Sequence, residues 1–327
     1  MSVLLSYDGE RVDYIFQALS RMMRMRMKKT VKTLVGVDLL GSYESAVELC
    51  KRIEFEDQEW VLIHALPVLP WYVPGMFPQV IPVAETNDVL QDAGRQALRK
   101  AREMVDDYQS TDHMQEGDVA TMITRYAQDE IADLIVMGSG HPKNGPLWKL
   151  GSVSRALSIE ARQSLLVAKL PSSKTGPVHA VFAADHSEYA NRALDQLISW
   201  NPKGFSRIDV ITAYEVNTST TAMLKRDTSV DLEFKDWVRD HCLKESAKVS
   251  EKLKAIAPEV NVIVQEGESN EVIRNAMTSS GADLLIMGAQ GHGFLDRLVI
   301  GSTSHHHFVA EPYPVLLLRL PAEMISE

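Results

Sequence analysis

The sequence of 327 residues has two cysteines, no long apolar run and fewer basic than acidic residues. Cys50 and Cys242 lie far apart and outside any CxxC spacing, which excludes a disulfide scaffold, disfavours a structural zinc site and is typical of a reducing cytosol. No apolar run approaches the roughly 18 residues that would span a bilayer. The positive charge of residues 21–29 follows apolar residues, whereas a secretory signal places it first. We therefore expect a cytoplasmic protein without a transmembrane segment.

The net charge and the chain length further restrict the class of protein that the sequence can encode. Lys and Arg total 34 against 44 Asp and Glu, and this net charge of -10 argues against a nucleic-acid binder, which needs a basic face. The chain is longer than one hydrophobic core usually spans, so we expect two domains. Residues 21–29 fit a solvated helix or a basic amphipathic helix that contacts a membrane or partner. The sequence has no GxSxG elbow, no Walker loop and no carboxylate spacing that would identify an enzyme class.

Two segments of the chain repeat each other at an offset of 150 residues. Residues 115–138 read QEGDVATMITRYAQDEIADLIVMG, and residues 265–288 read QEGESNEVIRNAMTSSGADLLIMG. LLVAKLP (165–171) matches VLLLRLP (315–321) at the same offset. Such self-similarity predicts a tandem duplication. We place the domains at 30–172 and 176–323, after a basic extension of residues 1–29.

Short apolar runs alternate with helical patterns in each half. Thr33–Val37 and Val178–Ala183 predict first strands, each followed by an aspartate and a helix. The runs LIVM (134–137) and LLIM (284–287) lack polar alternation, which suits parallel strands buried on both faces. The pattern predicts an α/β fold of two tandem, doubly wound, mostly parallel sheets, which is Rossmann-like. Because exposed edge strands tend to pair, we expect the final apolar strands to join the domains as an internal pseudo-dimer, and a further homodimer of the chain.

One irregular segment follows the second strand of each half. Residues 67–82 contain five prolines together with Trp71, Tyr72 and Phe77, which predicts an aromatic flap. Residues 215–231 form its polar counterpart. Both leave the carboxyl end of a strand, which is the edge where open α/β sheets bind ligands.

A glycine-rich loop follows the LLIM run. Gly288, Gly291, Gly301 and Ser302 are spaced G-x2-G-x9-G-S. Glycine allows a sharp turn out of a strand and lets backbone N–H groups approach a phosphate. A helix that begins near Gly301 would add its unpaired N–H groups, its positive dipole end and the hydroxyls of residues 302–304. The spacing predicts a phosphate cradle, with glycines that serve only as turns as the alternative.

These features together resemble the universal stress protein family in its tandem form, over residues 30–321. The resemblance implies an adenine nucleotide alpha hydrolase-like fold that binds ATP, ADP or AMP, and we expect Mg²⁺ to bridge the phosphates. In the family, the aspartate after the first strand lies at the nucleoside, the end of the second strand contacts the base and the glycine loop holds the phosphates. The residues implied in the second half are Ala184, Asp185, Ala213, Met287, Gly288, Gly291, His292, Gly301, Ser302, Thr303 and Ser304. Asp185 could instead only cap the next helix.

The first half departs from this pattern. His141 stands at the position of Gly291, where a side chain would hinder a close backbone approach, and Asp38 is followed by Leu39-Leu40-Gly41. Nucleotide binding in this half stays open, with Lys143 or Lys149 as compensating charges. The corresponding residues of the first half are Asp38, Gly138, Gly151, Ser152, Val153 and Ser154.

The leading hypothesis is a binding module that uses an adenine nucleotide in its C-terminal domain to signal to an unidentified protein during stress. The loop carries Asp296 and Arg297 as its charged residues, so we expect at most slow ATP hydrolysis. One alternative is an ATPase or nucleotidyl transferase, and the other is a nucleotide-free scaffold that binds an apolar ligand or protein through the first domain. The run His305–His307 does not predict a metal site, because consecutive helical residues point in different directions.

Overall fold

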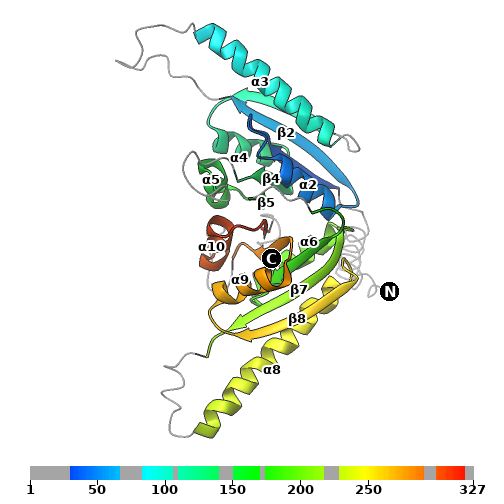
Figure 1. Cartoon of the computed structure of the whole chain (residues 1–327), viewed down its shortest axis with the longest axis vertical. Helices are drawn as coiled ribbons and strands as arrows, with labels where there is room; N and C mark the ends of the chain where they lie inside the picture. The colour runs from blue at the N-terminus through cyan, green and yellow to red at the C-terminus, as the bar shows by residue number, and fades with distance from the viewer. Residues whose placement is uncertain are drawn as a thin grey trace, which may run out of the picture.

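A computed structural model describes residues 30–66, 83–105, 110–139, 150–169, 174–216, 228–290 and 300–320. The expected N-terminal extension, the aromatic flap and the middle of both glycine loops (140–149 and 291–299) lie outside these ranges. Figure 1 shows the strands and helices alternating along both halves. The strands are β1 (Val31–Gly36), β2 (Gln58–Leu66), β3 (Ser110–Glu116), β4 (Leu134–Gly138), β5 (Ser164–Ala168), β6 (Val178–Ala183), β7 (Phe205–Tyr214), β8 (Glu259–Glu266), β9 (Leu284–Gly288) and β10 (Val315–Leu318). The helices are α2 (Glu44–Ile53), α3 (Val83–Met104), α4 (Val119–Asp129), α5 (Ser152–Glu160), α6 (Glu188–Ser199), α8 (Thr228–Leu253), α9 (Ser269–Ser280) and α10 (Ser302–Ala310).

The ten strands form one sheet in the order β3-β2-β1-β4-β5-β10-β9-β6-β7-β8. Neighbours within each half are parallel, as the continuous apolar runs predicted. The two five-stranded units are joined where β5 pairs antiparallel with β10. Each half is therefore the expected doubly wound unit, with its strand order reversing between β1 and β4 or between β6 and β9. Ligands of such sheets bind at these reversal points.

The joint between the halves has an approximate two-fold axis. Leu166 lies opposite Leu316, and Val167 lies opposite Val315. Leu166 and Leu316 are equivalent residues of the repeat, because their numbers differ by 150. An equivalent pair on a shared strand joint is the mark of an isologous contact. The expected pseudo-dimer through the last strands is thus what the structure contains.

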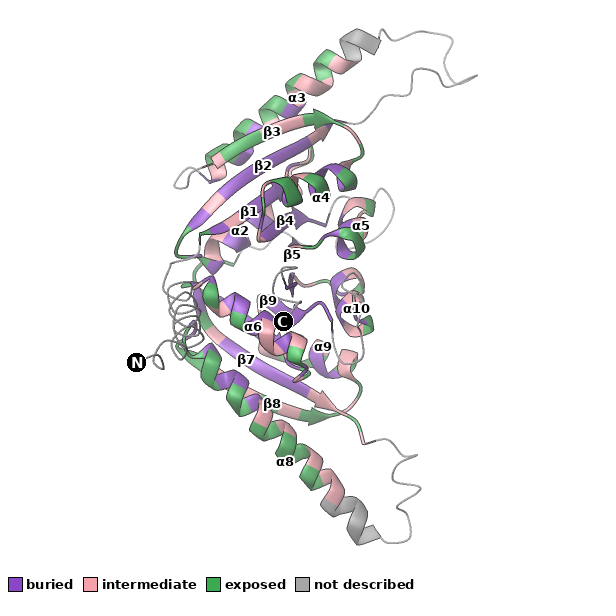
Figure 2. Cartoon of the chain, turned by 180° about the vertical axis from the view of Figure 1, so that it is seen from behind, coloured by how far each residue is buried: buried purple, intermediate pink, exposed green. Residues whose placement is uncertain are grey.

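Helices cover both faces of the sheet. On one face α2, α3, α6 and α8 enclose one cluster of buried apolar side chains, and on the other face α4, α5, α9 and α10 enclose a second cluster. Figure 2 shows the inner strands between them as mostly buried, whereas β3 and β8 at the edges of the sheet are partly or largely exposed. None of the described helices is both long and apolar enough to cross a membrane. Helix α8 begins at Thr228, so the polar segment predicted for 215–231 ends within a helix rather than before it.

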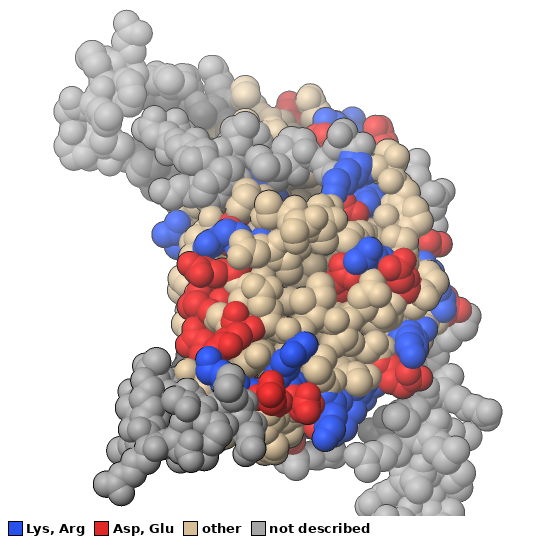
Figure 3. All heavy atoms as spheres, turned by 60° about the horizontal axis from the view of Figure 1, so that its bottom comes forward, with Lys and Arg blue, Asp and Glu red and all other residues tan. Residues whose placement is uncertain are grey.

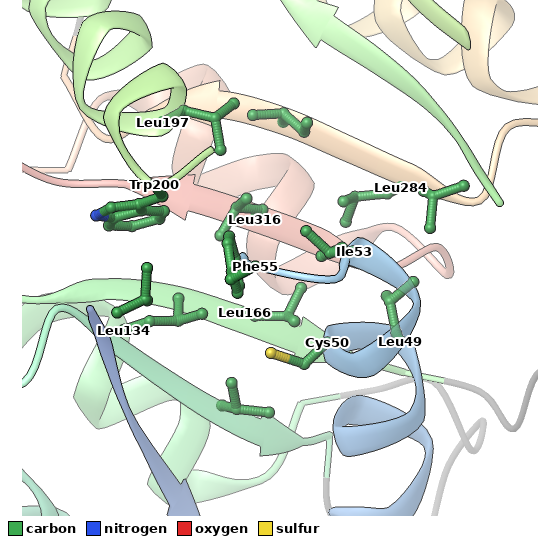
Figure 4. Close-up of a cluster of buried hydrophobic side chains, with 14 of the residues drawn as sticks. Leu49, Cys50, Ile53, Phe55, Leu134, Leu166, Leu197, Trp200, Leu284 and Leu316 are labelled. Carbon is green, nitrogen blue, oxygen red and sulfur yellow. The ribbon is translucent and has the colours of Figure 1, made fainter. Parts of the chain in front are cut away.

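Aromatic and aliphatic side chains continue the core across the joint. Phe55 at the end of α2 packs edge-on against Trp200 at the end of α6, with ring centroids 5.7 Å apart. Figure 4 shows both rings among leucines of the central strands, including Leu166 and Leu316. Burial of a large aromatic side chain stabilises a fold by about 1.5–3 kcal/mol. The two halves therefore share one hydrophobic core at their contact.

Charged side chains also link the halves. The Arg52 guanidinium of α2 lies 3.0 Å from an Asp283 carboxylate oxygen, and Lys174 lies 2.7 Å from the other oxygen. These cations lower the pKa of Asp283 against the effect of its burial. Elsewhere, the face shown in Figure 3 has acidic and basic side chains interspersed around an uncharged area.

Ile131, which follows α4, has a backbone conformation that we expect to be strained. It has a φ of 52° and is 82% exposed, although a β-branched residue disfavours this left-handed conformation. Its equivalent in the second half, Gly281, has a φ of 62°. We expect Ile131→Gly to raise the free energy of unfolding by roughly 0.5–1 kcal/mol, because relief of strain exceeds the entropy cost of glycine. Urea denaturation measures the change.

The reciprocal substitution is the control for this prediction. A side chain at Gly281 would have open space around its Cβ, so Gly281→Ile should lose only the conformational energy of about 1–2 kcal/mol. An Ile131→Gly variant that is less stable than the wild type would show that the exposed isoleucine contributes more through contacts than its backbone costs.

Candidate functional site

A cavity of about 240 Å³ lies at the strand-order reversal of the second half. It opens at the carboxyl ends of β6, β7 and β9 and is closed by the beginnings of α6, α9 and α10. Typical ligand clefts measure about 300–1,000 Å³, so the described walls enclose a volume near the lower limit. They consist of Ala183, Ala184, Asp185, Ala190, Ile211, Ala213, Ser269, Ile273, Met287, Gly288, Gln290, Gly301, Ser302, Thr303 and Ser304.

Nine of the eleven residues predicted for the second half line this cavity. They come from the turn after β6, the end of β7, the end of β9 and the first turn of α10. The remaining two, Gly291 and His292, lie outside the described residues. Four segments that are far apart in the sequence therefore meet at one place, at the edge where parallel sheets bind ligands.

The turn after β6 is held in place by its own side chains. An Asp185 carboxylate oxygen accepts hydrogen bonds from the Ser187 backbone N–H at 3.0 Å and from its hydroxyl at 2.7 Å. The Ser187 hydroxyl oxygen in turn accepts from the Ala190 N–H and caps α6. The helix cap is therefore Ser187, and the alternative that Asp185 itself caps the helix is wrong. Asp185 instead fixes the cap and lines the cavity.

His186 connects this turn to α8. It has a φ of 60°, and its Nε2 lies 3.1 Å from the Thr212 hydroxyl of β7 and 3.2 Å from the Ser246 hydroxyl of α8. Thr212 and Ser246 are themselves buried and 2.9 Å apart. The side chain thus ties the turn that lines the cavity to a strand and a helix behind it.

The first turn of α10 forms another wall. Gly301 is the N-cap and has no side chain to accept from this helix end, so the first N–H groups of α10 lie beside the cavity without an intrahelical partner. The Gly301 N–H itself bonds to the Ala289 carbonyl at 2.8 Å. The Ser304 hydroxyl donates to the Gly288 carbonyl at 2.7 Å, so it anchors the helix to β9 instead of serving as a donor for an anion. Donors for an anion are therefore the N–H groups of this turn and the hydroxyls of Ser302 and Thr303.

Gly288 and Gly301 leave space beside the cavity because they lack a side chain, and neither has a backbone conformation that only glycine adopts. Gly301 has φ -62° and ψ 151°, and Gly288 has no left-handed φ. A sharp glycine-specific turn at Gly288, as the spacing suggested, is therefore not observed. A Cβ on Gly288, which lines the cavity, would be 3.4 Å from its nearest neighbour, which is ordinary contact.

The cavity has little formal charge. Asp185 is the one ionisable group among the described residues that line it, and no described lysine or arginine does so. The helix end of α10 supplies partial positive charge, equivalent to roughly half an elementary charge. Alanine, isoleucine and methionine side chains form the rest of the wall. One end of the cavity is thus suited to an anion and the other to an apolar ring.

The corresponding region of the first half is occupied by its own chain. Seven residues, 37–43, separate β1 from α2, whereas four, 184–187, separate β6 from α6. Asp38 uses one oxygen to accept from the N–H groups of Leu40 and Ser42, and its other oxygen accepts from the Ser42 hydroxyl. A Cβ on Gly138 would be 1.9 Å from the Ser42 carbonyl oxygen. The β1–α2 loop (residues 37–43) therefore packs directly on Gly138, the equivalent of the Gly288 that borders the cavity in the second half.

The other predicted residues of the first half keep their structural contacts. Gly151 is the N-cap of α5 and its N–H bonds to the Ser139 carbonyl. The Ser154 hydroxyl donates to the Gly138 carbonyl at 3.0 Å, as Ser304 does to Gly288. Ser152 and Val153 form the first turn of α5. Helices α5 and α10 thus begin with the same geometry, while the space beside the beginning of each helix differs.

Sequence reasoning missed several lining residues. Ser269 and Ile273 come from α9, which follows the repeated QEG segment. Ser269 corresponds to Val119 at the offset of 150, and this polar replacement was the available signal. Gln290 lies inside the glycine loop and is almost fully buried. The remaining missed residues are Ala183, Ala190 and Ile211.

The three consecutive histidines of α10 have different surroundings. His307 is fully buried, lies 2.7 Å from the Tyr313 hydroxyl, and has its pKa lowered to about 4 by burial. His306 lies at the half-exposed side, 3.1 Å from a Glu311 carboxylate oxygen that also accepts from Arg274. The rings of His306 and His307 lie edge-on, with centroids 5.4 Å apart.

Comparison with known proteins identifies the class. The model of the universal stress protein family matches residues 31–169 and again 179–319, so the chain belongs to this family and carries two copies of its domain. A protein of Bacillus subtilis named universal stress protein YxiE is 28% identical over 141 residues, which are 42% of this chain and 95% of that protein. The structure of a universal stress protein from Archaeoglobus fulgidus aligns with a TM-score of 0.58 at 16% identity, over 88% of this chain and 98% of that one.

A further structure in the comparison is a universal stress protein in complex with cAMP. It covers 45% of this chain and all of its own, at 19% identity and a TM-score of 0.28.

Proposed function

We propose that the second half of this tandem universal stress protein binds an adenine nucleotide in the cavity between β6, β9 and α10, and that the bound state signals to another protein. The observation that carries the proposal is the convergence of nine predicted residues from four segments on one cavity. The resemblance to the family implies a contact with a nucleotide for each of these residues, which supports the proposal.

The chemistry of the walls fits the parts of a nucleotide. The apolar side chains of Ala213, Ile211 and Ile273 suit a purine ring, and the Asp185 carboxylate can accept a ribose hydroxyl. The N–H groups at the start of α10 suit the phosphates. With one carboxylate in the described wall, Mg²⁺ would be held mainly by the phosphates of ATP or ADP. The proposal therefore includes ATP, ADP or AMP, with the metal for the first two.

The first half does not bind nucleotide in this proposal. Its β1–α2 loop lies against Gly138, and Asp38 is engaged by the N–H groups and hydroxyl of that loop. The stoichiometry we expect is one nucleotide per chain. The same proposal includes domains at residues 30–172 and 176–323 and a homodimer of the chain. It also includes a cytoplasmic location, where the cysteines Cys50 and Cys242 would stay reduced, as free cysteines are.

Substitution of Ala213 by leucine tests the cavity. We expect Ala213→Leu to weaken the affinity for ATP by about tenfold or more, because the larger side chain occupies the space of the base. The measurement is calorimetric titration of ATP and Mg²⁺ into protein that has been unfolded, stripped of nucleotide and refolded. Mass spectrometry of the released small molecules identifies any nucleotide that was bound initially.

Ala65→Leu is the matched control. Ala65 lies opposite Gln115 and Ala213 lies opposite Gln265, so the two alanines occupy the same position of the repeat. Ala65→Leu should keep the wild-type affinity, with thermal unfolding reporting any loss of stability in both variants. A wild-type chain that neither contains nor binds nucleotide would overturn the proposal and favour a nucleotide-free scaffold. Two nucleotides per chain would overturn the assignment of the first half.

A further inference from the structure

Two buried basic side chains cross between the halves in a reciprocal way. Lys169 follows β5 and Arg319 follows β10, and they are equivalent residues of the repeat at the offset of 150. Lys169 is 2% exposed and Arg319 is 4% exposed. Such side chains are almost never fully buried unless partners satisfy them. Each of the two finds its partners in the opposite half.

Lys169 of the first half binds the end of α10 in the second half. Its Nζ donates to the His307 carbonyl at 2.8 Å and to the Glu311 carbonyl at 2.6 Å. His307 belongs to the last turn of α10 and Glu311 is its C-cap residue, and carbonyls at a helix end have no partner within the helix. Arg319 does the same for α5, where its guanidinium donates to the carbonyls of Ser158 and Ala161.

Helix α10 therefore spans the distance from the cavity to the other half. It has nine residues and is about 14 Å long at 1.5 Å per residue. Its beginning is attached to its own half through the Ala289 and Gly288 carbonyls, and its end is attached to Lys169. Both Figure 1 and Figure 2 show α10 beside α5 at the joint of the halves. A short helix fixed at both ends transmits a displacement at one end to the other.

Helix α10 should keep its attachment across the neutral pH range. Burial lowers the pKa of Lys169 to about 7, and the neutral amine still carries two hydrogens for two carbonyls. The charged or titratable groups that surround this end are Glu311, His306, His307, Arg274 and Tyr313. Without the amine, the carbonyls of His307 and Glu311 would lose these buried hydrogen bonds.

We propose that Lys169 is a positioning residue for the nucleotide site of the other half, acting through α10, and that the first half is thereby a regulatory module that sets the affinity of that site. This inference rests on the proposed nucleotide binding. It assigns a task to a half whose own site is filled by its β1–α2 loop. The N–H groups of residues 302–304 face a phosphate correctly only while both ends of α10 are held. By reciprocity of coupled sites, nucleotide at the beginning of α10 stabilises the contact of its end with Lys169.

The test compares ATP affinity in three full-length variants. Lys169→Met should weaken binding by about five- to tenfold or more, which is a typical coupling between sites. Lys169→Arg should restore most of the affinity, because its guanidinium can donate to both carbonyls. Arg319→Met removes the equivalent anchor from α5, so it should lower the melting temperature while changing the affinity less than twofold.

Hydrogen exchange of the wild-type chain supplies a second readout that does not depend on the folding of any variant. Saturating ATP should slow exchange at the end of α10, residues 308–310, and at β5 across the joint. Unchanged exchange there, or a Lys169→Met variant that binds like the wild type, would overturn the inference and leave the nucleotide site standing. A wild-type chain that binds no nucleotide would overturn the proposed function and this inference with it.

Discussion

Gly138→Ala is expected to destabilise the protein by about 3 kcal/mol or more. An added Cβ would lie 1.9 Å from the Ser42 carbonyl oxygen and 2.3 Å from its carbon, so the β1–α2 loop would have to move. Losses of this size come from overpacking in a buried, close-packed site. The loop is held by the hydrogen bonds between Ser42 and Asp38, which would be broken or bent by the movement. Urea denaturation followed by circular dichroism measures the loss.

Gly288→Ala is the matched substitution in the second half. Its Cβ would meet the Gln290 carbonyl at 3.4 Å and Tyr189 at 3.5 Å, which are ordinary contacts, so the stability should change by less than about 1 kcal/mol. The same methyl group would border the cavity and should weaken ATP binding. Equal stability losses for the two alanines would contradict the difference between the halves. A mild Gly138→Ala would show that the β1–α2 loop leaves its position easily.

Gly204→Ala is expected to have the largest effect on the joint of the halves. A Cβ there would be 1.7 Å from the Arg52 carbonyl oxygen and 2.8 Å from its carbon. The backbones approach this closely because the N–H groups of Lys203 and Gly204 donate to the carbonyls of Glu54 and Ile53, both at 2.9 Å. Separation of these segments would also disturb the packing of Phe55. We expect a loss of more than about 4 kcal/mol, or a chain that does not fold.

Gly176→Ala separates steric overlap from backbone strain in this region. Gly176 has a φ of 84°, its carbonyl accepts from Arg52, and a Cβ would have open space around it. It should cost only the conformational penalty of about 1–2 kcal/mol. Thermal unfolding of both variants makes the comparison, with the soluble yield as a second measure. If Gly204→Ala were no less stable than Gly176→Ala, the close contact between the halves would not exist in solution.

Much of the architecture could be predicted from hydrophobic pattern. The runs LIVM and LLIM became β4 and β9, fully buried on both faces, and the repeat gave both halves the same strand order. The contact between the halves through their last strands could be predicted because each of these strands would otherwise be an exposed edge. The two halves form one sheet in which Leu166 lies opposite Leu316. This pairing depends on the register of β5 and β10, which a run of apolar residues of similar shape does not determine.

The site could be predicted only where residues lie next to a recognisable pattern. Asp185 and Gly288 follow predicted strands, so their meeting at one sheet edge was foreseeable. Ser269 and Ile273 belong to a helix whose approach to the cavity depends on packing, which single residues do not reveal. The three additional residues of the β1–α2 loop are visible in the sequence, but the contact of Ser42 with Gly138 requires coordinates.

The pair Leu166 and Leu316 has a consequence for how this molecule can change. In an assembly of two identical chains, every substitution on the symmetry axis appears twice and meets its own copy. Here the two leucines are encoded separately, so either one can be replaced while the other compensates. Because the halves are also covalently connected, dilution cannot separate them. Because the two halves are one chain, one half can lose a binding site while the contact between the halves is kept.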